Sequence, residues 1–147
     1  MRQITLSLSL LLATYIFGQA TTTLSVTGSK ELIKRDALIA PYVVKARKKL
    51  NWFYKAYNKK NIKDAKYYAV IRLYDSDGKY DQIFAELKSW DGNRLTGRIT
   101  NTPKTVTQYR KDQVLEFKEE VILDWLIVYP NGKEKGNYIG NFLKQQQ

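Results

Sequence analysis

The sequence feature that most limits the possible folds is a change of pattern near residue 58. The residues before it have a helical periodicity, and those after it form strand-like segments. Between residues 41 and 58, apolar side chains recur at intervals of three and four. A rotation of about 100° per residue places them within an arc of roughly 100°, the width of a helix face packed on a core. Pro41 stands in the first turn, where its missing N–H group is tolerated. We predict one long amphipathic helix whose buried face consists of Val43, Ala46, Leu50, Phe53, Tyr54 and Tyr57.

The remainder of the chain has the pattern of an antiparallel sheet. Runs rich in tyrosine and β-branched or aliphatic residues are separated by Asp-Gly and Asn-Gly turn sequences, which is typical of hairpins. The predicted strands cover residues 67–74, 83–87, 94–100, 114–117 and 126–129, with a final segment at 138–142. The sequence thus predicts an α+β domain in which one long N-terminal helix packs on a strongly curved antiparallel sheet, or partial barrel, of five to six strands.

The first twenty residues have the features of a signal peptide. Arg2 precedes an apolar run over residues 4–17, and the small-residue sequence Gly18-Gln19-Ala20 follows it. The run is shorter than the ~20 apolar residues that cross a bilayer, so a retained anchor is the weaker alternative. We expect cleavage before Thr21, a periplasmic or secreted protein, and no transmembrane anchor after cleavage.

The rest of the chain is expected to form one domain. A length of 147 residues suits a single domain better than two, and we find no Pro-rich or Ser-rich linker or internal repeat. We divide the chain into an N-terminal extension at residues 21–36, a single α+β domain at 37–143 and a polar tail at 144–147.

The absence of histidine and cysteine excludes several classes of chemistry. Histidine-based triads, thiol nucleophiles, disulfides and most transition-metal sites need one or both of these residues. We therefore expect neither a cofactor nor a metal. Asp75, Asp77 and Glu86 have the spacing of a calcium loop, but Tyr80 stands where such a loop needs glycine. A hairpin turn is the better interpretation of this segment.

Basic residues are concentrated in the predicted helix and the loop after it. Residues 37–63 contain eight lysines and arginines and no acidic residue. Residues 64–147 contain thirteen basic and twelve acidic residues, whereas the whole chain carries a net charge of +11. Most of the positive field therefore comes from one element, and the expected partner is anionic.

Opposite the apolar arc, the helical rotation places Trp52 among Lys45, Lys48, Lys49 and Lys55. Two interpretations stay open: a solvated lysine surface over which the indole folds, and an anion-binding site where the indole supplies a stacking platform. A membrane-surface helix is disfavoured because the apolar arc is needed for the core. Nucleic acid is disfavoured because an exported protein seldom meets it.

Short motifs in the second half of the chain occur in a distinctive order. They are Gly-Arg-Ile-Thr-Asn-Thr-Pro at 97–103, Asp-Gln-Val-Leu-Glu-Phe at 112–117, Ile-Leu-Asp-Trp at 122–125 and Gly-Asn-Tyr at 136–138. Together with the Lys-Ala-Arg helix at 45–47, this order resembles the YegJ-like bacterial domain of unknown function (DUF2314-type) over about residues 37–142. The resemblance implies an α+β fold and a bacterial source without implying a reaction. We assign structural roles to the motif residues Gly97, Asn101, Pro103, Asp112, Asp124, Trp125 and Gly136.

The chain departs from this family at two places. Gln82 and Phe84 stand where the family often shows a histidine and a tryptophan, and Lys111 stands where a glycine commonly precedes the aspartate. Any role of that histidine is therefore absent from this chain.

Three functions from different classes are compatible with the sequence. The favoured one is a non-catalytic binding module for an anionic envelope component or an acidic protein, with Trp52 and its four lysine neighbours as the ligand site. The second is a structural or interaction protein, for example a toxin-associated partner, without a ligand site. The third is a hydrolase in which Asp124 and Glu119 or Glu120 share acid and base work on a glycosidic bond; it requires a carboxylate separation that the sequence does not fix.

Overall fold

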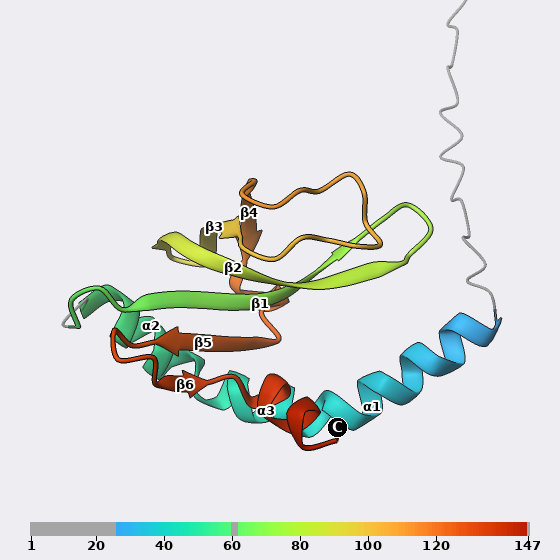
Figure 1. Cartoon of the computed structure of the whole chain (residues 1–147), viewed down its shortest axis with the longest axis horizontal. Helices are drawn as coiled ribbons and strands as arrows, with labels where there is room; N and C mark the ends of the chain where they lie inside the picture. Colours follow the sequence, from blue (N-terminus) through green and yellow to red (C-terminus); the bar gives the residue numbers. More distant parts are fainter. Residues whose placement is uncertain (1–25, 60–61, 147) are drawn as a thin grey trace, which may run out of the picture.

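The computed structural model describes residues 26–59 and 62–146, which form three helices and one six-stranded antiparallel sheet (Figure 1). The helices are α1 (Val26–Lys48), α2 (Leu50–Lys59) and α3 (Tyr138–Gln145), and a 3-10 turn, η1, covers Glu119–Val121. The strands are β1 (Lys66–Tyr74), β2 (Tyr80–Asp91), β3 (Arg94–Ile99), β4 (Val114–Lys118), β5 (Asp124–Val128) and β6 (Glu134–Gly136). Their order across the sheet is β4-β3-β2-β1-β5-β6. The α+β class is thus confirmed.

The core lies between α2 and one face of the sheet. The β1–β2 register sets Ala69 opposite Ala85 and Ile71 opposite Ile83 on this face, and all four side chains are buried. Phe53 of α2 stacks on Trp125 of β5 with ring centroids 4.9 Å apart. The predicted apolar helix face accordingly points inward, with Ala46, Leu50, Phe53 and Tyr57 buried and Val43 and Tyr54 half-buried.

The prediction of one long helix over residues 41–58 is wrong. Helix α1 begins at Val26, so Pro41 lies inside it, and a turn at Lys49 separates α1 from α2. The indole N–H of Trp125 donates to the Ala46 carbonyl (3.0 Å), and the Lys49 amide also donates to that carbonyl. An inserted side chain of this kind interrupts the regular helical hydrogen-bond ladder, which accounts for the break.

The sheet is not closed into a barrel, because β4 and β6 remain its edges. Nevertheless, side chains of β1 and β4, which are separated by two strands, line the same cavity of about 420 Å³, so this face of the sheet is concave. The final predicted segment at 138–142 lies in helix α3. Phe142 of α3 stacks on Tyr42 of α1 with a centroid distance of 4.4 Å. Within the described residues, no helix has the length and apolar character of a membrane span.

Candidate functional site

Trp52 lies on α2 and is partly exposed, with 42% of its surface accessible. Its ring is tilted against Trp125, with centroids 5.7 Å apart, and the ammonium group of Lys135 lies 3.7 Å from the indole centroid. Lys135 belongs to β6 and was not among the predicted site residues. The turn signal at residues 130–132 was available, but the pairing of β6 beside β5 was needed to place this lysine over the helix.

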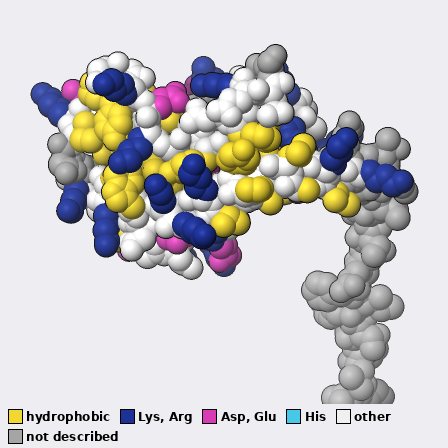
Figure 2. All heavy atoms as spheres, turned by 90° about the horizontal axis from the view of Figure 1, so that it is seen from below, with side chains coloured by type: hydrophobic (Ala, Val, Ile, Leu, Met, Phe, Trp, Pro, Cys, Tyr) yellow, Lys and Arg dark blue, Asp and Glu magenta, His cyan; other side chains and the backbone are white. Residues whose placement is uncertain are grey.

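The four lysines predicted around Trp52 are all exposed. Among the described residues, none of them takes part in an ion pair, and neither does Lys135. The Lys45 ammonium lies 5.1 Å from the ring centroid of Tyr138. We call the surface formed by Lys45, Lys48, Lys49, Trp52, Lys55 and Lys135 the cationic face. Figure 2 shows Lys and Arg side chains gathered over the part of the surface that α2 and β6 form.

Several acidic groups are engaged by partners outside this face. Glu86 and Asp112 both pair with Arg98 on the sheet. Asp81 accepts three backbone N–H groups from the loop after β3. Although burial acts to raise it, the pKa of Asp81 is held below its ordinary value by these hydrogen bonds. These three carboxylates therefore do not neutralise the lysines of the cationic face.

The first four motif residues shape β3 and the loop that follows it. A Cβ on Gly97 would lie 2.9 Å from the Ala85 Cβ, so a small residue is required there. The Asn101 side chain accepts from the Phe84 amide (2.8 Å) and thereby binds the loop to β2. Asp112 adopts a φ of 68° and accepts a hydrogen bond from Arg98 (2.9 Å). Pro103 is half-buried and directly precedes the three amides that Asp81 binds.

The remaining motif residues join β5, β6 and α3. Asp124 is completely buried, and its carboxylate accepts from the amides of Trp125 (2.8 Å) and Ile139 (2.7 Å). Burial raises the pKa of Asp124 to about 6, while the backbone N–H groups at the start of α3 act in the opposite direction. Gly136, with a φ of 88°, passes directly over Trp125. Asp124 therefore holds the first turn of α3 in place.

The structure buries one member of the carboxylate pair considered for a glycosidase. Asp124 has no exposed surface, so a substrate cannot contact it in this conformation. Glu120 is exposed and lies 3.8 Å from the Lys118 ammonium, and Glu119 is half-buried in η1. In the 75–79 turn, Asp75 accepts from the amides of Asp77 and Lys79, as in a hairpin turn.

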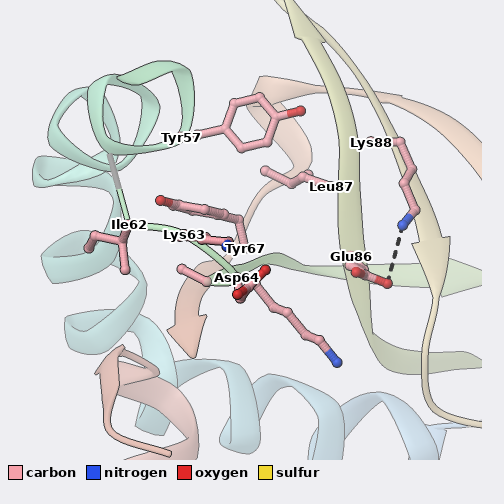
Figure 3. A pocket seen from close by; sticks show the side chains of 10 residues that line it. Tyr57, Ile62, Lys63, Asp64, Tyr67, Glu86, Leu87 and Lys88 are labelled. Carbon is pink, nitrogen blue, oxygen red and sulfur yellow. Dashed lines mark ion pairs between the residues drawn. The ribbon is translucent and has the colours of Figure 1, made fainter. Parts of the chain in front are cut away.

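A second cavity of about 300 Å³ lies beside the α2–β1 loop (Figure 3). Tyr57, Tyr67 and Leu87 form its apolar side, and lysine and carboxylate side chains stand around it. Lys88 and Glu86 form an ion pair of 3.3 Å across its rim. Because both signs of charge meet here, this cavity has no clear preference for an anion or a cation.

Comparison with known proteins identifies the family but no activity. A family model described as an uncharacterized protein conserved in bacteria, DUF2314, matches residues 36–147. No curated protein and no solved structure matches the chain significantly. The matched region contains every motif on which the resemblance was predicted, so that prediction is confirmed. The chain belongs to the DUF2314 family of uncharacterized bacterial proteins.

Proposed function

We propose that this protein is an exported, non-catalytic binding module that uses the cationic face to bind an anionic component of the cell envelope. The observation that carries the proposal is the cationic face itself: Lys135 lies over the partly exposed Trp52 indole, the other four lysines are exposed on α1, on α2 and at the turn between them, and none of the five is ion-paired within the described part of the chain. A cluster of unneutralised ammonium groups attracts polyanions and raises their local concentration. An acidic protein could use the same attraction and is the alternative partner.

Trp52 supports a more limited role than a free stacking platform. The Lys135 ammonium already lies over its ring, and Trp125 is tilted against it. A ligand therefore reaches only the remaining exposed part of the indole. We infer that charge supplies most of the affinity and that Trp52 adds a contact at the centre of the cationic face.

The export part of the proposal rests on residues 1–20, which lie outside the described residues. A signal peptide there would be removed before Thr21. We expect N-terminal sequencing of the protein recovered from a bacterial envelope or medium fraction to begin at Thr21. Recovery of a chain that keeps Arg2 and stays in the cytosolic fraction would contradict export.

Binding to heparin, a soluble polyanion, tests the cationic face. We expect the variant with Lys45, Lys48, Lys49 and Lys55 all changed to Gln to bind roughly 1000-fold more weakly at low ionic strength, because each lysine near an anionic surface contributes about 1 kcal/mol and the four together about 4 kcal/mol. Affinity of the wild type should fall steeply with added salt. The measurement is a titration at two salt concentrations.

A matched variant separates local from global charge. Changing Lys63, Lys79, Lys104 and Lys111 to Gln removes the same charge from exposed lysines outside the cationic face, and should weaken binding only a few-fold. Trp52→Ala should weaken binding further than Tyr74→Ala, which also removes an exposed aromatic ring. Equal losses in both lysine variants would show that net charge alone acts, and would favour a structural protein without a ligand site.

A further inference from the structure

Helix α1 carries a second apolar arc that faces solvent. Ile33 and Val44 are 67% and 52% exposed, and Ala37 and Ala40 are also exposed. At about 100° per residue these four side chains fall within an arc of roughly 60°. The arc lies opposite the side that packs on the protein, where the most deeply buried residues are Ile39 and Ala46. This arc was not predicted, because the helix was expected to begin near Pro41, after three of these four residues.

Lysines border the exposed arc along one side. The same rotation places Lys30, Lys34, Lys45 and Lys48 within about 60° to 120° of Ile33, and all four are exposed. Leu38, at 55% exposure, lies just beyond them. An apolar stripe next to a row of ammonium groups is the pattern of a helix that lies in a membrane interface.

The opposite border of the arc is fixed to the body of the protein. Asp36 forms an ion pair with Arg72 of β1, and the Arg47 guanidinium donates to the carbonyls of Glu120 and Ile122, at 2.9 Å each. These contacts hold the rotation of α1 so that the apolar arc stays outside. Figure 1 shows the first turns of α1 extending past the sheet, and Figure 2 shows a band of hydrophobic side chains along α1 that meets the basic surface.

We infer that α1 docks on the surface of an anionic lipid bilayer, with Ile33, Ala37, Ala40 and Val44 inserted and the lysines at the level of the phosphates. This inference rests on the proposed function and names the anionic component as lipid. Apolar side chains of such a helix enter the boundary between headgroups and acyl chains, while long lysine side chains extend to the charged layer.

A second copy of the chain fits this surface less well. Pairing two α1 helices through the apolar arc would bring two rows of lysines together. Between Leu32 and Lys48 the sole acidic residue is Asp36, which already pairs with Arg72. Like charges at such an interface cost free energy, whereas anionic headgroups compensate them.

Flotation with lipid vesicles tests this inference on the full chain. We expect binding to vesicles of phosphatidylcholine with one third phosphatidylglycerol, and at least tenfold weaker binding to phosphatidylcholine alone. The double variant Ile33→Ser/Val44→Ser should bind the anionic vesicles roughly tenfold or more weakly, because it removes the two largest side chains of the arc. All variants keep the same N-terminal residues, so the difference reports on α1.

The control variant is Val114→Ser, which changes an exposed apolar residue of the edge strand β4 and should bind like the wild type. Unchanged heparin binding by Ile33→Ser/Val44→Ser together with lost vesicle binding would support the inference. Heparin binding without vesicle binding by the wild type would overturn the lipid assignment and leave the proposed function intact. If the wild type bound neither heparin nor vesicles, the proposed function would be rejected as well. A wild-type dimer that dissociates in Ile33→Ser/Val44→Ser would assign the arc to a second copy instead.

Discussion

Gly136→Ala is expected to destabilise the domain by about 4 kcal/mol, because the substitution combines backbone strain with a steric clash. Gly136 has a φ of 88°, a conformation that residues with a side chain seldom adopt. An added Cβ would lie 2.2 Å from the carbonyl oxygen of Trp125 and 2.5 Å from its ring. Trp125 is fully buried and stacks on Phe53, so neither contact can relax without moving the core.

Gly132→Ala provides the matched control for this prediction. Gly132 has a similar φ of 79°, but nothing lies within 4 Å of an added Cβ. Its replacement carries the backbone strain without the clash and should cost about 1 to 2 kcal/mol. The measurement is urea unfolding followed by tryptophan fluorescence. Equal losses of stability in the two variants would show that β6 does not approach Trp125 as closely as the structure indicates.

Part of the helical region could be predicted because its period is local. The six side chains from Val43 to Tyr57 all face the protein, as their spacing requires. The break at Lys49 could not be predicted, because it depends on a hydrogen bond from Trp125, a residue 79 positions after Ala46. A long-range competitor for one helical carbonyl leaves no trace in the local pattern.

The strands could also be predicted where their pattern is local. Alternation and turn residues locate β1 to β5, whereas residues 138–142 were assigned incorrectly because an eight-residue helix has too few turns to show its period. A feature that is distant in the sequence stabilises α3, because the Asp124 carboxylate accepts from the Ile139 amide in its first turn. The candidate site was similarly incomplete, since Lys135 reaches Trp52 only through the pairing of β6 with β5.

The stability of the Asp124→Asn variant relative to the wild type should rise by about 3 kcal/mol as the pH increases from about 3.5 to 7. Burial raises the pKa of Asp124 from 3.8 to about 6 in the folded protein, so between these values the folded state holds a proton that the unfolded state has lost. The stability that Asp124 contributes is therefore complete below pH 3.8 and is lost as the pH rises through 6. Two pKa units correspond to about 3 kcal/mol. Asparagine is neutral throughout and does not undergo this loss.

Asp81→Asn supplies a control of opposite sign, because the Asp81 carboxylate also accepts backbone N–H groups but lies closer to solvent. Burial alone would raise its pKa, yet the three amides hold the pKa below the ordinary value. Its contribution to stability is present above the ordinary pKa and is lost as the pH falls. The measurement is urea unfolding between pH 3.5 and 8. With rising pH, the free energy of unfolding of Asp124→Asn should increase relative to the wild type, whereas that of Asp81→Asn should decrease relative to the wild type. A stability difference for Asp124→Asn that does not vary with pH, or that shifts in the same direction as that of Asp81→Asn, would mean that the amides at the start of α3 outweigh burial and keep this carboxylate ionised.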